Sequence, residues 1–150
     1  IILYGVSMGA ATVLMAAGRD LPENVKGIIA DCPYSSPGDI IRKVARDMHM
    51  PDRLAWPFVK IGGRVYGGFD VDEMDAARAV KQATVPILII HGESDSFVPC
   101  EMSDIVSENP ALVMRYTFPG ADHGFSYLVD TPRYKKIVTE FAEKALAPKA

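Results

Sequence analysis

Three residues whose types together perform acyl transfer, Ser7, Asp95 and His123, each follow a short apolar stretch of the chain. A serine hydroxyl is a poor nucleophile unless a neighbouring imidazole takes its proton as the new bond forms. A carboxylate that accepts from the other ring nitrogen fixes the tautomer of the imidazole and stabilises the imidazolium. The order Ser, Asp, His along the chain is one in which such triads occur. We therefore predict that Ser7 is the nucleophile, His123 the general base and Asp95 the residue that orients His123.

The serine lies in the segment Gly5-Val6-Ser7-Met8-Gly9, which has the pattern G-x-S-x-G. An apolar run precedes this segment and an alanine-rich one follows it, so the pattern predicts a sharp turn between a strand and a helix. Both glycines are expected to be needed there, because a Cβ would collide with the strand or the helix. A helix N-terminus favours developing negative charge, so we expect the backbone N–H of Met8 to donate to the oxyanion. The alternative is a glycine-rich turn with an incidental serine.

Other assignments of the polar residues are open. Asp31 follows another apolar segment and is the rival acid, while Asp95 could instead cap the helix after it. We favour Asp95 because its loop closely follows a buried strand and precedes His123, for which an exposed surface position is the alternative. Three further residues are expected to have no catalytic role. We interpret His91 as a hydrogen-bonded structural residue and His49 as a surface or lid residue. Asp122 is interpreted as a turn residue.

Apolar runs alternate with helical patterns, which predicts an α/β fold with a parallel sheet. The predicted strands are 1–4, 26–30, 87–91 and 114–118. The predicted helices are 8–17, 39–48, 72–83, about 100–107 and 132–146. The carboxyl ends of parallel strands meet at one edge of the sheet, where ligands collect. The three triad candidates are therefore expected to come together at that edge.

Residues 39–69 differ in character from the rest of the chain. They combine an amphipathic helical pattern with large apolar residues and the glycine pairs Gly62-Gly63 and Gly67-Gly68. We interpret them as a helical, lid-like insertion in a single domain whose core is 1–38 and 70–150. Trp56 and Phe58 are its candidate substrate-binding residues. A helical hairpin packed on the core is an equally good interpretation of the same pattern.

Composition and net charge limit the partners, cofactors and location that we expect for this chain. The chain has 150 residues, a net charge of −3 and two cysteines far apart in sequence. A weakly acidic chain disfavours nucleic acids and anionic membranes as partners. Two distant cysteines form neither a metal motif nor a disulfide framework, so we expect no metal or cofactor. We expect a cytoplasmic location; the alternative is membrane anchoring through an N-terminal segment absent from this chain.

The chain resembles the α/β-hydrolase superfamily at the segment around Ser7, at 91–99 (HGESDSFVP) and at 120–124 (GADHG). Within this superfamily it is similar to bacterial serine hydrolases of the Bem46-like and serine-aminopeptidase-like group. The resemblance implies a serine hydrolase that cleaves a small-molecule ester or related acyl bond through an acyl-enzyme. A peptidase or amidase of the same fold and a non-catalytic fragment or scaffold member are the alternatives.

The resemblance covers the C-terminal portion of the family's fold. It places the family's N-terminal strands and second oxyanion donor outside these residues, so we expect the 150-residue chain alone to be inactive. It also implies that the Ile1–Tyr4 strand is central in the complete sheet. We therefore expect that strand to pair with a second copy or with the missing N-terminal segment.

Overall fold

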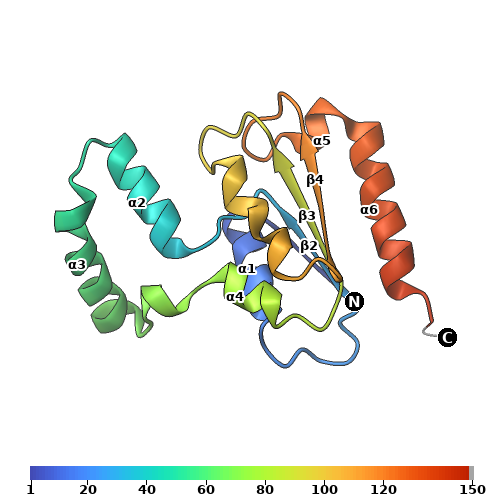
Figure 1. Ribbon diagram of the computed structural model, residues 1–150, viewed down its shortest axis with the longest axis horizontal. Helices are drawn as coiled ribbons and strands as arrows, with labels where there is room; N and C mark the ends of the chain where they lie inside the picture. Colours follow the sequence, from blue (N-terminus) through green and yellow to red (C-terminus); the bar gives the residue numbers. More distant parts are fainter. Residues whose placement is uncertain (149–150) are drawn as a thin grey trace.

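The computed structural model describes residues 1–148, except for the side chains of residues 52, 54 and 55, and contains a parallel sheet flanked by helices (Figure 1). The strands of this sheet are β1 (Ile2–Val6), β2 (Gly27–Asp31), β3 (Ile87–Gly92) and β4 (Val113–Phe118). They lie in the order β1-β2-β3-β4, and every neighbouring pair is parallel. The predicted α/β class is therefore confirmed, and the strand ends that carry the candidate site lie on one edge of the sheet.

The central strands are apolar because both of their faces are covered. Every residue of β2 and β3 is buried, and Ile28 of β2 is in register with Ile87 of β3. Parallel strands covered on both faces have continuous apolar sequences of this kind. The sheet thus gives the loops at its carboxyl edge a rigid base.

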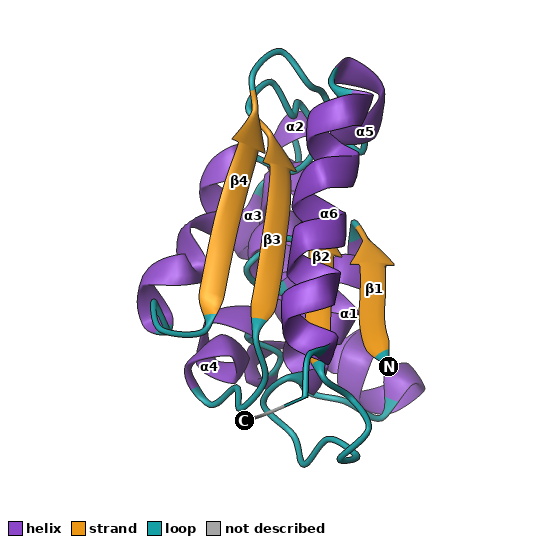
Figure 2. Ribbon diagram, turned by 90° about the vertical axis from the view of Figure 1, so that its right-hand side faces the viewer, coloured by secondary structure: helices purple, strands orange, loops and turns teal. Residues whose placement is uncertain are grey.

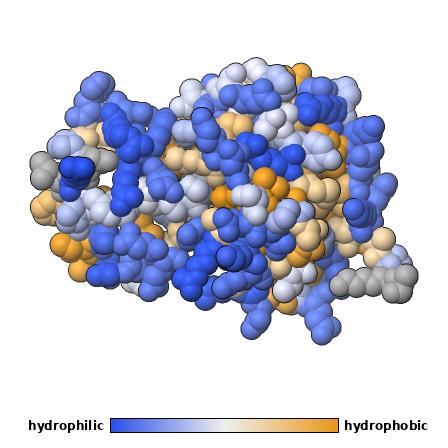
Figure 3. Space-filling model, viewed as in Figure 1, coloured by the Kyte–Doolittle hydropathy of each residue, from blue (hydrophilic) through white to orange (hydrophobic). Residues whose placement is uncertain are grey.

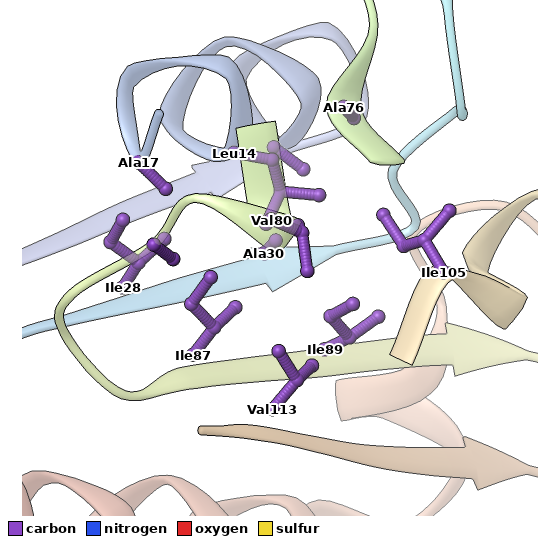
Figure 4. Packing of buried hydrophobic residues seen from close by; sticks show 12 residues of the cluster. Leu14, Ala17, Ile28, Ala30, Ala76, Val80, Ile87, Ile89, Ile105 and Val113 are labelled. Carbon is purple, nitrogen blue, oxygen red and sulfur yellow. The ribbon is translucent and has the colours of Figure 1, made fainter. Parts of the chain in front are cut away.

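Helices from three crossovers cover the first face of the sheet. They are α1 (Met8–Ala16), α4 (Ala76–Lys81) and the 3₁₀ helix η3 (Cys100–Glu108). Leu14 of α1, Val80 of α4 and Ile105 of η3 pack against the isoleucines of β2 and β3 (Figure 4). The opposite face is covered by α6 (Thr131–Leu146), which runs along the strands, in front of β2, in Figure 2.

Several elements differ from the sequence prediction. The first strand continues beyond residue 4 to Val6, and the segment after β3 is a 3₁₀ helix. The single helix predicted for 72–83 is divided into η2 (Val71–Glu73) and α4. Asp75 separates the two, because its side chain accepts from the N–H groups of Ala77 and Arg78 and so caps α4. A short helix, α5 (Ser126–Val129), was not predicted.

The insertion consists of α2 (Pro37–Asp47), α3 (Asp52–Gly62) and the π-helical turn η1 (Gly63–Gly67), which stand to one side of the sheet (Figure 1). Between α2 and α3 lies an apolar cavity of about 240 Å³. Trp56 lines this cavity and stacks under the Arg42 guanidinium, whereas Phe58 is 75% exposed. Hydrophobic side chains are accordingly visible at the outer end of the insertion (Figure 3). The helices form a hairpin with this cavity between them.

Strand β1 lies at the edge of the sheet (Figure 2) and, within residues 1–148, pairs with β2 only. Its apolar side chains Tyr4 and Val6 are largely exposed. An apolar edge with unpaired backbone groups favours pairing with another chain. We expect the 150-residue chain to associate through this edge, with a copy of itself or with the N-terminal part of the fold. Size-exclusion chromatography with light scattering checks this.

A substitution in the edge strand provides the control for that measurement. Val6→Lys places a charge on β1 and should shift the chain toward monomer, since charges on edge strands oppose pairing. Leu146→Lys changes a similarly exposed apolar residue at the end of α6 and should leave the mass unchanged. A parent chain that elutes as a monomer at all concentrations contradicts the expectation.

Candidate active site

Ser7 occupies the turn between β1 and α1 in a strained backbone conformation. Its φ is 53° and its ψ is −116°, an unfavourable region for a residue with a side chain. The turn is held by the Ser7 N–H, which donates to the carbonyl of Asp31 at 2.8 Å. This bond ties the serine to the end of the neighbouring strand β2. The serine hydroxyl is thereby fixed at the carboxyl edge of the sheet.

The two glycines beside this turn are not equivalent. A Cβ on Gly5 would lie 2.2 Å from the carbonyl oxygen of Gly9, so a side chain cannot fit between strand and helix. A Cβ on Gly9 would meet no atom of the described residues within 4 Å. The prediction that both glycines avoid a collision is therefore right for Gly5 and wrong for Gly9.

Alanine substitutions test this difference. Gly5→Ala should destabilise the fold by roughly 3 kcal/mol or prevent folding, because strand and helix would have to separate. Gly9→Ala should leave stability unchanged or raise it by up to about 1 kcal/mol, since alanine favours helix. Chemical denaturation of the two variants measures both effects. Equal losses from the two substitutions would contradict the steric account.

The three predicted triad residues lie in a hydrogen-bonded row. His123 Nε2 is 2.9 Å from Ser7 Oγ, and His123 Nδ1 is 2.8 Å from Asp95 Oδ2. The carboxylate can only accept, so Nδ1 carries the proton and Nε2 accepts from the serine hydroxyl. The Asp95 side chain is fully buried, whereas that of His123 is 24% exposed. The imidazole of His123 is therefore partly accessible to solvent, and the carboxylate of Asp95 is not.

The side chain of Asp95 is held in place by its own loop. Asp95 Oδ1 accepts the backbone N–H groups of Phe97 at 3.0 Å and Val98 at 2.7 Å. Gly92 allows this loop to approach the histidine loop, because a Cβ there would lie 2.3 Å from the carbonyl oxygen of Ala121. One oxygen of Asp95 is thus held by backbone, and the other faces His123.

Asp122 joins the two loops, a role that the sequence did not reveal. Its Oδ1 accepts the N–H of Ser96 at 2.8 Å and the N–H of His123 at 2.8 Å. The Ser96 hydroxyl donates to the same oxygen at 3.0 Å. These N–H groups stabilise the carboxylate, chiefly that of Ser96, and lower the pKa of Asp122. The residue predicted to serve only the turn therefore also fixes the acid loop relative to the base.

The insertion reaches the same loop through Lys43 of α2. Its ammonium donates to the carbonyl of Ser96 at 2.8 Å and lies 5.6 Å from the ring centre of Phe97. The Phe97 ring in turn packs edge-on against the imidazole of His123, with 5.2 Å between ring centres. The candidate lid residues Trp56 and Phe58 lie farther out on α3, and the cavity that Trp56 lines includes none of the triad residues.

Asp31, the rival acid, lies at the end of β2 with a different partner. Its Oδ2 accepts the hydroxyl of Tyr134 on α6 at 2.7 Å, and that hydroxyl is 2.9 Å from the hydroxyl of Tyr4. Burial, above all other causes, raises the pKa of Asp31. The carboxylate that contacts the imidazole is thus that of Asp95, and the carboxylate of Asp31 joins β2 to α6.

Cys32 lies close to the triad. Its Sγ, a carboxylate oxygen of Asp95 and a ring nitrogen of His123 lie within 4.8 Å of one another, and such groups can bind a metal ion. Burial raises the pKa of the Cys32 thiol to about 12, so it stays protonated at neutral pH. The Asp95 and His123 atoms already bind each other at 2.8 Å. The hydrogen-bonded triad explains this cluster without a metal.

The structure also places the other three residues considered in the sequence analysis, Met8, His49 and His91. Met8 is the first residue of α1, and the first N–H groups of an α-helix have no partner within the helix. Its N–H remains the predicted oxyanion donor, directly after Ser7. His49 is exposed just after α2. His91 is fully buried with a hydrogen-bond partner, as its structural reading requires, but it also contacts Asp95. That contact was not predicted.

Within the part of the chain that the structure describes, no helix is both long and apolar enough to cross a bilayer.

The fold is shared with solved hydrolases. A puromycin-hydrolysing peptidase of Mycobacterium tuberculosis superposes with a TM-score of 0.71 at 20% identity, covering 99% of this chain and 22% of the peptidase. An acylaminoacyl peptidase of Pyrococcus horikoshii gives 0.70 at 18% identity, covering 99% and 24%. An esterase of Pyrococcus furiosus gives 0.67 at 21% identity, covering 98% and 54%. The predicted α/β-hydrolase fold is therefore confirmed.

Sequence comparison agrees with the fold. The chain is 26% identical over 148 residues to the uncharacterised Bacillus subtilis protein YqkD, covering 94% of this chain and 47% of YqkD. It thus spans about half the length of this curated relative. Residues 1–149 match the sequence pattern of the prolyl oligopeptidase family. The chain belongs to the prolyl oligopeptidase family, whose members are serine hydrolases of the α/β-hydrolase fold.

Proposed function

We propose that this chain carries the triad of a carboxylesterase-like serine hydrolase, with Ser7 as nucleophile, His123 as base and Asp95 as the orienting acid. The observation that carries the proposal is the row of hydrogen bonds at 2.9 and 2.8 Å through the imidazole of His123. The burial of Asp95 supports it, because a buried carboxylate interacts more strongly with an imidazolium than an exposed one does.

The reaction follows from this geometry. Ser7 Oγ attacks the substrate carbonyl as its proton moves to His123 Nε2, and the resulting oxyanion accepts from the N–H of Met8. The carbon–oxygen bond to the leaving group breaks, and His123 returns the proton to the departing alkoxide. Water then attacks the acyl-enzyme in the same way, releasing the acid and regenerating Ser7. The resemblance to the α/β-hydrolase superfamily implies a second oxyanion donor in the N-terminal part of that fold.

The surroundings of the triad favour a substrate with an apolar acyl or aromatic group. Exposed apolar side chains flank each catalytic residue: Met8 follows the nucleophile, Phe97 packs on the base, and Phe125 follows the histidine loop. Such side chains stabilise a bound apolar group by removing its surface from water. The placement in the Bem46-like and serine-aminopeptidase-like group remains a proposal of the same kind.

Hydrolysis of aminoacyl or peptide bonds is the second candidate. It is favoured by the family and by the peptidases among the structural relatives. The same triad serves both reactions, since each passes through an acyl-enzyme. The two differ in the leaving group, which is an alkoxide from an ester and an amine from an amide.

The experiment uses the full-length protein. Fluorophosphonate labelling should place the adduct on Ser7, and peptide mass spectrometry identifies the residue. Turnover of p-nitrophenyl esters of increasing acyl length is then compared with that of aminoacyl p-nitroanilides. A larger rate enhancement over uncatalysed hydrolysis for the esters supports the esterase, and a larger enhancement for the anilides supports the peptidase. A labelled protein that turns over neither series contradicts both, and absence of an adduct on Ser7 contradicts the triad.

A further inference from the structure

We propose that His91 is a positioning residue for the candidate triad: its Nε2–H, which donates to the carbonyl of Val98, also lies against the carboxylate oxygen of Asp95 that binds His123. This inference rests on the triad proposed above. His91 is the last but one residue of β3 and is fully buried. Its Nε2 lies 3.2 Å from Asp95 Oδ2 and 3.0 Å from the carbonyl oxygen of Val98. The acid therefore lies between two imidazoles.

The surroundings of His91 determine its tautomer. Both groups near Nε2, a carboxylate oxygen and a carbonyl oxygen, can only accept, so Nε2 must carry the proton. The Nδ1 atom is buried and has no hydrogen-bond partner among the described residues. A bare nitrogen costs less there than an unpaired N–H would. Burial lowers the pKa of His91, which keeps the ring neutral.

The same contacts form a closed network around Asp95. Val98 donates its N–H to Asp95 Oδ1 and accepts from His91 with its carbonyl. The carboxylate is thus held at Oδ1 by backbone and at Oδ2 by His91, so its plane is fixed before His123 binds. His91 begins this network from a rigid central strand, whereas the other contacts come from the loop.

The contact with His91 also reduces the negative charge that Asp95 Oδ2 presents to His123. A donor on Oδ2 draws negative charge toward itself, so the carboxylate stabilises the His123 imidazolium less than an unshared oxygen would. Removing this contact should lower kcat, because the carboxylate is then free to turn. The other ionisable groups near the two rings, Asp31, Cys32, Asp122 and Arg115, are unchanged by substitutions at His91.

Two amide substitutions of His91 test whether the N–H beside Asp95 matters or only the presence of a ring. In His91→Gln the amide nitrogen is as many bonds from Cβ as Nε2, so it can still reach Asp95. In His91→Asn the amide nitrogen takes the place of Nδ1, and Oδ2 loses its second donor. The two variants keep a buried amide of similar polarity and differ in the contact.

In the full-length enzyme, His91→Asn should lower kcat by about 10- to 100-fold, the usual effect of a lost hydrogen bond to a charged group. KM should change little. His91→Gln should keep kcat within about threefold of the parent.

Equal kcat values in the two folded variants would overturn the inference. Nitrogen-15 NMR of the parent gives a test without substitution, in case His91→Asn does not fold. His91 should show a protonated Nε2 and a bare Nδ1, and the opposite tautomer would also overturn the inference. Fluorophosphonate labelling separates the two proposals: a labelled Ser7 with either of these results contradicts the role of His91 alone, and an unlabelled Ser7 contradicts the triad itself.

Discussion

Ser7→Ala should abolish nearly all ester turnover of the full-length protein, a loss on the order of a millionfold in kcat. The alanine cannot form an acyl-enzyme, so only the oxyanion donor and binding contribute to the residual rate. His123→Ala should cost about as much, and the double substitution should add little, because the two residues act as one unit. Steady-state kinetics with a p-nitrophenyl ester, together with thermal denaturation to verify folding, measures these effects. A Ser7→Ala variant within a hundredfold of the parent would contradict the assignment of the nucleophile.

Asp95→Asn should lower kcat by about 10⁴-fold with little change in KM. The amide places a donor or a weaker acceptor against His123 Nδ1, which disfavours the tautomer that accepts from Ser7. Asp31→Asn should cost less than about tenfold, because the carboxylate of Asp31 binds Tyr134 and not the imidazole. Comparable losses from the two substitutions would mean that the acid is misassigned or that Asp31 is essential for the fold.

Stability against pH distinguishes these possibilities for Asp31. Burial raises its pKa in the folded protein, so ionising Asp31 costs folding free energy above the ordinary carboxyl range. Asp31→Asn removes that cost, and the variant should be at least as stable as the parent at pH 7. Its advantage should disappear as the pH falls through the pKa of Asp31 toward 4, because the parent then carries a neutral carboxyl too. Denaturation midpoints across this range check the sign.

Residue type and position along the chain were enough to predict the sheet and to choose the triad candidates. The run Ile87-Leu88-Ile89-Ile90 is uninterrupted because both faces of β3 are covered, so its sequence alone identifies a buried strand. Ser7, Asp95 and His123 each follow such a strand, and parallel strands bring their carboxyl ends together. The distances among the three are consistent with the predicted triad, whose catalytic roles remain a prediction.

Features that depend on how loops pack were not predictable in this way. The sequence predicts only a turn role for Asp122. Its bond to Ser96 joins loops 26 residues apart in sequence, and a local pattern does not reveal such a contact. The contact between His91 and Asp95 depends on how the chain bends after Gly92, which residue types do not encode. The four-residue helix α5 is too short to show a periodic pattern. Gly9 was assigned a steric role from its pattern, although the space beside it is open.

The strand order has a consequence for synthesis. Each strand pairs with the next one along the chain, so the sheet can grow in the direction in which the ribosome delivers it. Each pairing must still close a long crossover, because Ile28 of β2 pairs with Ile87 of β3, and parallel sheets built from such long-range pairs fold slowly. His123, however, lies beyond β4, and α6 after it covers the second face. The proposed nucleophile and acid therefore precede the proposed base in synthesis, and the candidate triad is complete only once the segment after β4 has been made.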